Sequence, residues 1–253
     1  MKIALCGLGK AGVQLVRLAT ERQGVELSMA FCRDGSDKAG KTISDVLPYK
    51  GFSSPIFELK SAAEAFLRDK PDVLVDFSSP DATMELLHLC AANGVKMVIC
   101  TTNFTSEELA LLEKTAKETQ GFGLVYAPNI TLGVNVLMEL VEETSRYLPE
   151  FDYAITEKHH NRKEDVSATA RKIAKRLENV LKKPVPVNSI RVGGYVGLHE
   201  VMAVGEFERI TLIHESFSRQ AFANGALLAA DYLLCRTGYF EMRDVVMDYF
   251  GKR

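Results

Sequence analysis

The chain has 253 residues, of which 47% are hydrophobic and 25% charged, and its formal net charge is −2. It can therefore bury a sizeable core as one or two domains, and it has no overall attraction to nucleic acid or to an anionic membrane, so we expect neither as a partner. The five cysteines are odd in number, far apart and without a C-x-x-C pair, which indicates neither a disulfide framework nor a metal site and favours the reducing cytoplasm.

The N-terminal stretch "MKIALCGLGKAG" is interrupted by Gly7 and Gly9 and lacks a long hydrophobic region, so we expect no signal peptide. The uncharged run 119–138 approaches membrane-spanning length, but it contains Pro128 and Asn129. We therefore predict a strand, a turn and a helix start at this place instead of a membrane span.

Short apolar runs in the first half are typical of parallel strands covered on both faces. They are residues 2–7, 25–31, 72–77, 96–102 and 122–127. Helical segments separate them, and two of these begin with capping boxes, Ser61 with Glu64 and Thr105 with Glu108. A third begins at Ser79, which can cap a helix whose first residue is a proline. This alternation predicts an α/β fold with a Rossmann-type doubly wound parallel sheet.

The first predicted strand leads directly into "GLGKAG", which has the G-x-G-x-x-G spacing. Gly7 permits the tight turn, Gly9 lets backbone N–H groups approach a pyrophosphate, and Gly12 allows close packing of helix against strand. The motif follows a strand and precedes a helix, which favours dinucleotide binding over a purely structural glycine turn. We expect Lys10 and Ala11 of the same loop to contact the cofactor.

The end of the second predicted strand bears on which dinucleotide is bound. Cys32 stands where an acidic residue would normally bind the ribose hydroxyls, and Arg33 follows it. Lys38 and Lys41 are near enough to face a 2′-phosphate, so NADPH is favoured over NADH. In the alternative interpretation Arg33 is a solvated loop residue and Asp34 binds the ribose.

The second half changes pattern. A helix is expected near 132–148, strand-like alternation begins at "FDYAIT", another amphipathic helix follows, and three further strands are predicted at "SIRVGGYV", "HEVMAVGEF" and "RITLIHES". This succession predicts an α+β domain with a mixed sheet. We place the dinucleotide-binding domain at 1–127, joined by a C-terminal helix at 240–253, and the second domain at 128–239.

The stretch "EKHHNRKEDVSATA" spans residues 157–170. It lies between a strand that ends near Glu157 and a helix that begins near Ser167. At such a helix start, Ser167, Ala168 and Thr169 would present backbone N–H groups and hydroxyls to an anionic carboxylate. The sequence therefore predicts an anion site here.

The basic side chains of the same stretch allow several interpretations. Lys163 can add a positive charge, and His159 or His160 can carry a proton near neutral pH. A metal site is disfavoured, because neighbouring histidines on an extended chain point to opposite sides and no cysteine or second histidine cluster lies nearby. For the histidines alone, a solvated charged loop remains an equal alternative.

Seven stretches resemble, in order, the bacterial 4-hydroxy-tetrahydrodipicolinate reductases of lysine and diaminopimelate biosynthesis. They are "GLGKAG", "VDFSSPDAT", "CTTNF", "APNITLGVNVL", "EKHHNRKEDVSATA", "GLHEVMAVGE" and "HESFSRQAFANGALLAA". The resemblance implies NAD(P)H-dependent reduction of a small dicarboxylate. It also implies a homotetramer, formed through the sheet of a second domain that binds substrate.

The resemblance also implies roles for single residues. His159 would deliver a proton, Lys163 would bind and polarise the substrate, and His160 would line the same pocket. The backbone of Ser167, Ala168 and Thr169 would grip a substrate carboxylate. The residues implied beside the cofactor, in addition to the glycine loop and Arg33, are Phe77, Cys100, Thr101, Thr102, Ala127, Pro128 and Asn129.

Two stretches depart from the family pattern. Where the family has D-A-P-S-G-T-A, this chain has "DVSATA", which is one residue shorter, lacks the proline and replaces a glycine with Ala168. Where the family has G-T-T-G, this chain has "CTTN". We expect Asn103 to keep the turn, because asparagine tolerates positive φ, and we expect Cys100 to be a packed residue and not a nucleophile.

Two alternative functions stay open, the first because of these departures and the second because a fold alone does not establish a function. One is a related reductase that acts on another small anionic imine or enamine. The other is a non-catalytic NADP-binding sensor, against which the intact His159 and Lys163 argue.

Overall fold

The computed structural model describes residues 1–47 and 53–251. The chain divides into two compact units, and each is described by itself: unit 1 comprises Met1–Ile130 and Phe222–Arg253, and unit 2 comprises Thr131–Ala221. The boundaries predicted from sequence place residues 128–130 and 222–239 in the second domain, whereas the structure includes them in unit 1. For 222–239 the physical reason is that the helix Gln220–Leu233 leads into a strand, Gly238–Glu241, that pairs within the first sheet.

Unit 1 is built on a seven-stranded sheet in the order β11-β6-β5-β4-β1-β2-β3, and all of its strand pairs are parallel. Its strands are β1 (Lys2–Cys6), β2 (Glu26–Cys32), β3 (Ile56–Glu58), β4 (Val73–Asp76), β5 (Lys96–Ile99), β6 (Gly123–Tyr126) and β11 (Gly238–Glu241). The order reverses between β1 and β4, so the carboxyl ends of these two strands form the crevice in which doubly wound sheets bind ligands.

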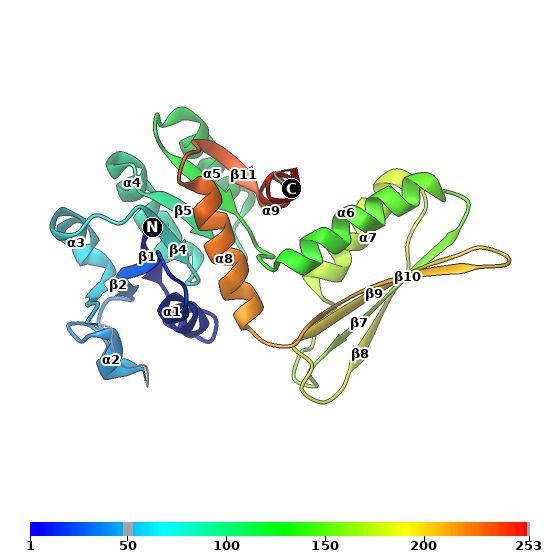
Figure 1. The fold of residues 1–253 in the computed structure, drawn as a ribbon, viewed down its shortest axis with the longest axis horizontal. Helices are drawn as coiled ribbons and strands as arrows, with labels where there is room; N and C mark the ends of the chain where they lie inside the picture. The colour runs from blue at the N-terminus through cyan, green and yellow to red at the C-terminus, as the bar shows by residue number, and fades with distance from the viewer. Residues whose placement is uncertain (48–52, 252–253) are drawn as a thin grey trace. The chain divides into compact units, whose positions relative to one another are not determined.

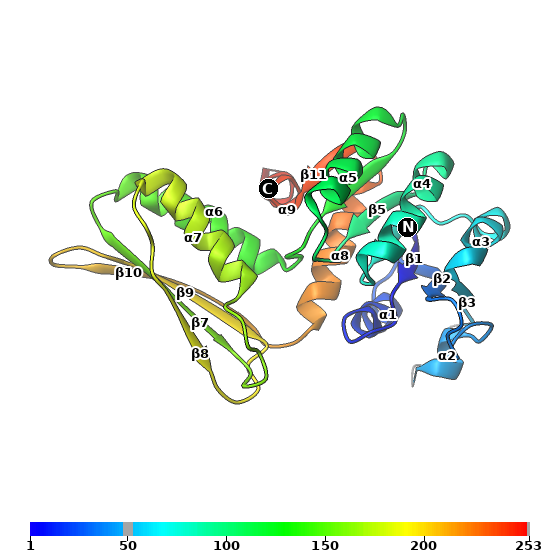
Figure 2. The ribbon, with the colours of Figure 1, turned by 180° about the vertical axis from the view of Figure 1, so that it is seen from behind.

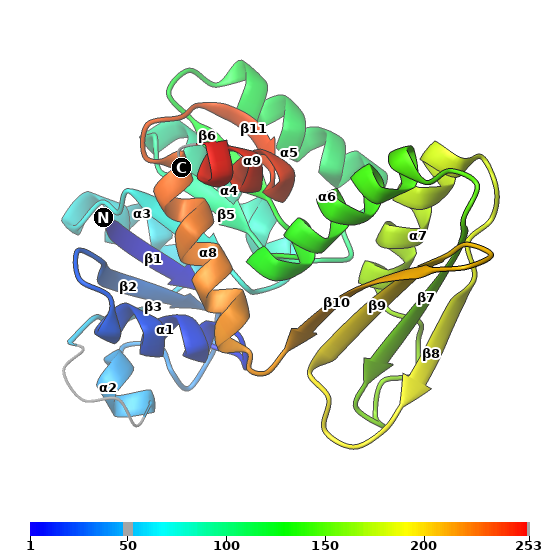
Figure 3. The same ribbon diagram turned by 45° about the vertical axis from the view of Figure 1, so that its right-hand side comes forward.

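Helices cover both faces of this sheet (Figure 3). They are α1 (Gly12–Glu21), α2 (Ile43–Val46), α3 (Ala62–Arg68), α4 (Pro80–Asn93), α5 (Ser106–Glu118), α8 (Gln220–Leu233) and α9 (Met242–Gly251), with a 3-10 turn at Leu59–Ser61. One core layer joins the strands to α3, α4 and α5 through side chains such as Phe66, Leu86 and Leu112. The predicted doubly wound sheet is confirmed.

The predicted helix starts have different outcomes. Thr105 and Glu108 form the expected capping box of α5, and Ser79 caps α4 with a proline at its first turn. The capping box predicted at Ser61 with Glu64 is wrong. Ser61 has φ −94° and ψ 3° and makes no cap hydrogen bond, because the 3-10 turn runs directly into α3.

Unit 2 is a four-stranded sheet covered on one face by two helices, which lie side by side (Figures 1 and 2). Its elements are α6 (Leu132–Tyr147), β7 (Asp152–His159), α7 (Ala168–Leu181), β8 (Val187–Arg191), β9 (Gly197–Val204) and β10 (Arg209–Ser216). The strand order is β10-β9-β7-β8. The β7–β8 pair is parallel and the other pairs are antiparallel, so the predicted mixed sheet is confirmed.

Within residues 1–47 and 53–251, no helix is both long enough and apolar enough to cross a membrane. In the same part of the chain, no three His, Cys, Asp or Glu side chains are grouped so that they would hold a metal ion.

Candidate active site

The glycine loop of unit 1 connects β1 to α1. Gly7 has φ +94°, and a Cβ there would lie 2.5 Å from the carbonyl oxygen of Phe77. A Cβ on Gly12 would lie 1.9 Å from the carbonyl oxygen of Gly7, whereas a Cβ on Gly9 would meet nothing within 4 Å. Gly7 and Gly12 are therefore required by the protein's own packing. Gly9 keeps an open face of backbone, which fits the approach of a pyrophosphate.

A cleft of about 530 Å³ adjoins this loop at the carboxyl ends of β1, β2 and β4. Among the predicted cofactor residues, Gly7, Gly9 and Arg33 line it, and Lys38 lies on the same wall. Ser78, Ser79 and Leu8 also line it, although the sequence analysis did not name them as cofactor residues. The cleft lies where the strand order reverses, which is the usual place for a nucleotide in this fold.

The polar side chains that follow β2 have different surroundings. The Nζ of Lys38 donates to the carbonyl oxygen of Leu8 in the glycine loop at 3.3 Å. Arg33 is exposed at the cleft. The carboxylate of Asp34 instead accepts a hydrogen bond from the amide of Lys60 at 3.2 Å, which holds it toward the segment after β3.

A buried carboxylate holds the loop after β4. Asp76 is 0% exposed, and its Oδ1 accepts from the amide and hydroxyl of Ser78 at 2.9 and 2.5 Å. Its Oδ2 accepts from the hydroxyl of Thr83, and the amide of Ser78 also approaches the hydroxyl oxygen of Thr101 at 3.1 Å. Burial raises the pKa of Asp76, and the hydrogen bonds from Ser78 and Thr83 oppose this rise. The carboxylate thus joins the loops that follow β4 and β5.

Among the other predicted cofactor residues, Lys10 and Ala11 lie in the glycine loop outside the lining of this cleft, and Phe77 follows β4. The rest follow β5 and β6: Cys100, Thr101, Thr102, Ala127, Pro128 and Asn129. The amide of Cys100 donates to the carbonyl oxygen of Asp76 at 2.9 Å, and the amide of Ala127 donates to that of Ile99 at 2.8 Å. Asn103 has φ +70°, so the expected turn is confirmed. Burial raises the pKa of the Cys100 thiol well above its ordinary value, which agrees with a packed residue and argues against a thiolate nucleophile.

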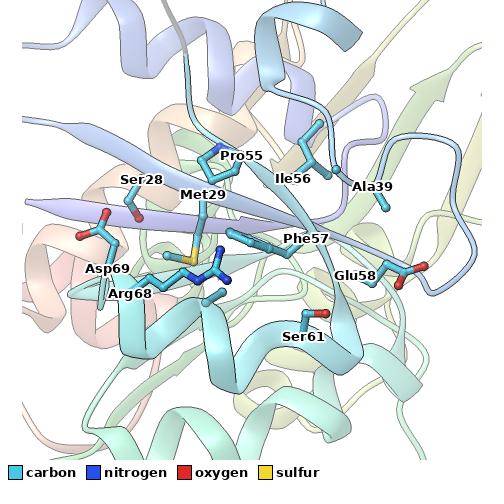
Figure 4. A pocket seen from close by; sticks show the side chains of 12 residues that line it. Ser28, Met29, Ala39, Pro55, Ile56, Phe57, Glu58, Ser61, Arg68 and Asp69 are labelled. Atoms are coloured by element: carbon cyan, nitrogen blue, oxygen red, sulfur yellow. The ribbon is translucent and has the colours of Figure 1, made fainter.

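Unit 1 has a second cleft of about 510 Å³, bounded by β2, β3 and α3 (Figure 4). Met29 and Phe57 line it with apolar surface, and Arg68 and Glu58 contribute polar groups. Within the described residues, its lining includes none of the predicted cofactor or substrate residues.

In unit 2, β7 brings a histidine next to a buried carboxylate. Glu157 is 0% exposed, and its Oε2 lies 2.5 Å from Nδ1 of His159, two residues further along the same face of the strand. Nε2 of His159 makes no hydrogen bond within the described part of the chain. Burial lowers the pKa of His159, the hydrogen bond and charge of Glu157 raise it, and the charges of Lys163 and Arg191 lower it further.

The helix start predicted to bind an anion is present. Ser167 is the N-cap of α7, and its hydroxyl accepts from the amide of Ala170 at 3.4 Å. The amide of Ser167 donates to Oε1 of Glu157 at 3.1 Å, and its Oγ lies 3.0 Å from Nε2 of His199. The Ser167 amide is therefore already engaged, and Ala168 and Thr169 are the residues of the first turn that follow it.

The loop between β7 and α7 turns at the second histidine. The amide of Lys163 donates to the carbonyl oxygen of His160 at 3.1 Å, and the amide of His160 donates to that of Tyr195 at 3.0 Å. Nδ1 of His160 is buried and has no hydrogen-bond partner among the described residues. The structure thus brings His159, Lys163 and Ser167 to one end of the unit 2 sheet.

Sequence reasoning missed three residues of this site: Glu157 as a buried group, Arg191 and His199. A signal for Glu157 was present, because strand alternation puts it on the same face as Tyr153 and Ile155, which are buried. Arg191 and His199 carried no comparable local signal, since their contacts depend on which strands pair with β7.

The Rossmann-type fold, the cleft at the glycine loop of unit 1 and the site around His159 in unit 2 define the chain as a pyridine-nucleotide-dependent oxidoreductase. Family models described as "Dihydrodipicolinate reductase, N-terminus" and "Dihydrodipicolinate reductase, C-terminus" match residues 1–130 and 133–246. The chain belongs to the dihydrodipicolinate reductase family, and the resemblance drawn from its motifs is confirmed.

Known proteins of this family resemble the chain over nearly its whole length. The 4-hydroxy-tetrahydrodipicolinate reductase of Methanopyrus kandleri is 35% identical over 99% of this chain and 97% of that protein. The enzyme of the same name from Methylococcus capsulatus is 34% identical over 94% of each chain. A solved structure of dipicolinate-bound dihydrodipicolinate reductase from Paenisporosarcina sp. TG-14 matches with a TM-score of 0.82 and 25% identity, covering 95% of this chain and 97% of that one.

Proposed function

We propose that the chain catalyses the NAD(P)H-dependent reduction of hydroxytetrahydrodipicolinate, by way of its dehydrated form, to tetrahydrodipicolinate in lysine and diaminopimelate biosynthesis. Its membership of the reductase family supports the reaction class. The observation that carries the proposal is the pair of His159 and Glu157 on β7, which a hydrogen bond from the Ser167 amide to Glu157 joins to the capped start of α7. This arrangement provides an oriented proton donor beside the proposed anion site.

The substrate side follows from charge and hydrogen bonding. The Paenisporosarcina relative is described as dipicolinate-bound, and dipicolinate is a small dicarboxylate. In this chain, Lys163 offers one positive charge, and the first turn of α7 at Ala168 and Thr169 offers backbone donors at the positive end of a helix. His160 completes the proposed substrate pocket. The shorter "DVSATA" loop still ends in a capped helix start, which supports retention of carboxylate binding.

The chemistry divides between the cofactor and the chain. The nicotinamide, when bound, supplies the hydride. His159 supplies the proton from Nε2, while its Nδ1 is held by Glu157. Lys163 binds and polarises the substrate, so that negative charge developing during hydride addition is stabilised.

The glycine loop fits a dinucleotide, since Gly9 leaves open backbone where a side chain would otherwise stand. NADPH is favoured over NADH, because Arg33 and Lys38 line the cleft while Asp34 is engaged by the amide of Lys60. Replacing Arg33→Ala should lower the ratio of NADPH to NADH affinity roughly tenfold, as expected for one lost charged contact of about 1.4 kcal/mol. An unchanged ratio in equilibrium titrations would count against this assignment.

The assembly we propose is a homotetramer formed through the sheet of unit 2, with the chain in the cytoplasm. The sheet face opposite α6 and α7 carries exposed apolar side chains such as Ile190 and Ile213, which are 41% and 58% exposed. Within unit 2, no described helix covers this face, and an apolar sheet face of this kind suits burial against another copy. All five cysteines are thiols, which suits a reducing compartment. Analytical ultracentrifugation tests the oligomeric state.

A steady-state assay tests the reaction. The purified chain should oxidise NADPH or NADH when the dihydrodipicolinate precursor is generated enzymatically, and the proposal is lost if both cofactors remain reduced. His159→Gln should lower turnover by roughly 10²–10⁴-fold with little change in cofactor affinity, which is the contribution of a positioned general acid. Lys163→Ala should also lower turnover. The matched controls are His88→Gln and Lys175→Ala, which change exposed residues on α4 and α7.

A further inference from the structure

The buried carboxylate of Glu157 faces the helix-covered side of the unit 2 sheet. It shares this face with Tyr153 and Ile155, which belong to the hydrophobic core. A charged group in such a place is unfavourable unless it is paired and hydrogen-bonded. Its partners therefore indicate what the charge is for.

Hydrogen bonds reach Glu157 from four separate side chains or amides. Oε1 accepts from the Ser167 amide at 3.1 Å, the Ser189 hydroxyl at 2.7 Å and Nη2 of Arg191 at 2.7 Å. Oε2 lies 2.9 Å from Nη1 of Arg191 and 2.5 Å from Nδ1 of His159. Burial opposes ionisation, but the hydrogen bonds from Arg191, Ser189, His159 and Ser167 outweigh it and lower the pKa of Glu157 to about 2. Glu157 is therefore an anion at physiological pH.

An anion at Nδ1 decides which nitrogen of His159 reacts. A carboxylate only accepts hydrogen bonds, so the neutral imidazole must carry its proton on Nδ1 and direct Nε2 away from Glu157. The charged and titratable groups acting on His159 are Glu157 on its own strand, Lys163 in the following loop, Arg191 on β8 and His199 on β9. Among these, Glu157 is the group that stabilises the protonated imidazole.

The same ion pair also shapes the loop that leads to the anion site. Nε of Arg191 donates to the carbonyl oxygen of Lys163 at 2.8 Å, and Nη2 donates to that of Asp165 at 2.7 Å. Glu157 holds the amide of Ser167, where the loop ends and α7 begins. The loop between His159 and Ser167 is thus attached to one carboxylate at both ends and to one guanidinium in between.

We propose that Glu157, held by Arg191, is the positioning residue of this reductase, setting both the proton donor His159 and the helix start at Ser167. This inference rests on the proposed function for its catalytic meaning. It explains how the shorter "DVSATA" loop can present a defined helix start without the family's proline and glycine, because the buried ion pair supplies the restraint.

The first test needs no turnover. Long-range nitrogen–proton NMR spectra of the isotope-labelled chain report the tautomer and titration of each of the five histidines, and the His159→Gln spectrum assigns the signal of His159. Neutral His159 should be the Nδ1–H tautomer, and Glu157→Gln should lower its pKa because the partner that stabilises the imidazolium is lost. An Nε2–H tautomer in the wild type, or an unchanged titration in Glu157→Gln, would overturn the inference.

The second test separates positioning from mere stability. Since the acid must be protonated, kcat/KM falls as pH rises above the pKa of His159. Glu157→Gln should therefore shift this alkaline limb of the pH profile to lower pH. At pH values above the shifted limb, kcat/KM should be reduced by about 10²-fold or more. Affinity for NADPH should stay within about twofold. The control Glu139→Gln neutralises a carboxylate that pairs with Arg176 elsewhere in unit 2. It should leave the pH limb unchanged, and an equal shift in both variants would refute a specific role.

A further variant covers the case in which Glu157→Gln does not fold. Arg191→Lys keeps a positive charge for Glu157 but loses the fork that holds the carbonyl oxygens of Lys163 and Asp165. It should raise KM for the dicarboxylate several-fold while the pH limb stays in place. An unchanged KM would contradict the proposed restraint on the loop. The tautomer of His159 in the wild-type NMR spectrum would still decide whether Glu157 orients the proton donor. If the wild type is inactive but shows the Nδ1–H tautomer, the proposed reaction fails while the inferred geometry stands.

Discussion

Buried His199 should make the stability of the protein depend on pH in a defined window. The side chain is 5% exposed on β9, its Nε2 lies 3.0 Å from Oγ of Ser167, and its Nδ1 is buried without a partner in the described residues. Burial, helped by the neighbouring imidazoles of His159 and His214, lowers its pKa from 6.5 to about 4. The folded protein therefore prefers this histidine neutral.

The sign and size of the effect follow from this difference in pKa. Above pH 6.5 the ring is neutral in both states, and its full contribution to stability is present. As pH falls from 6.5 toward 4, only the unfolded chain takes up the proton, so the free energy of unfolding decreases. The loss attributable to His199 is about 2 kcal/mol at pH 5 and about 3 kcal/mol at pH 4.

Urea unfolding at constant protein concentration measures this loss. We expect His199→Gln, which keeps a polar group near Ser167 but does not titrate, to remove about 2 kcal/mol of the stability change between pH 7.5 and pH 5. The control His88→Gln replaces an exposed histidine on α4 and should retain the wild-type dependence. If wild type and His199→Gln lose stability in parallel over this range, the burial argument is wrong.

Three other outcomes can be measured in unit 1. Gly9→Ala should weaken NADPH binding about tenfold or more in fluorescence titrations without lowering the melting temperature, because its Cβ meets no protein atom; a large loss of stability would contradict this. Gly12→Ala and Gly225→Ala should each destabilise the fold by about 1–3 kcal/mol or more in urea unfolding, because each Cβ would lie 1.9 Å from a backbone carbonyl oxygen. If either variant is as stable as the wild type, the backbone adjusts freely at that position. Asp76→Asn should lower the free energy of unfolding by about 1–3 kcal/mol and weaken NADPH binding, since an amide N–H would face hydroxyl and amide donors. An unchanged affinity for NADPH would show that the hydrogen bonds around residue 76 do not affect cofactor binding.

Sequence-based prediction succeeded where the physical cause is local. The capping box of Thr105 depends on one helical turn, and the positive φ of Asn103 depends on the tolerance of that residue, so both could be predicted. The same kind of reasoning failed at Ser61. There, a neighbouring 3-10 turn replaced the extended N-cap conformation that a capping box needs.

The candidate site was predictable in part for the same reason. His159, Lys163 and Ser167 stand in one short stretch between a strand and a helix, so their grouping could be expected from sequence and resemblance. Arg191 lies 34 residues from Glu157 in sequence, and His199 lies 32 residues from Ser167. No local pattern reports contacts over such separations.

The sequence by itself determined the class of this protein: a strand, a glycine loop and a helix in order, alternating elements before a mixed α+β segment, and motifs that assign the family. Only the tertiary structure decided how the site is held. The register of β7 against β8 and β9 sets Glu157 opposite Ser189 and His199, and sets His159 opposite Arg191. Register is a property of paired strands, so the charge that orients the proton donor became visible only when the strands were assembled.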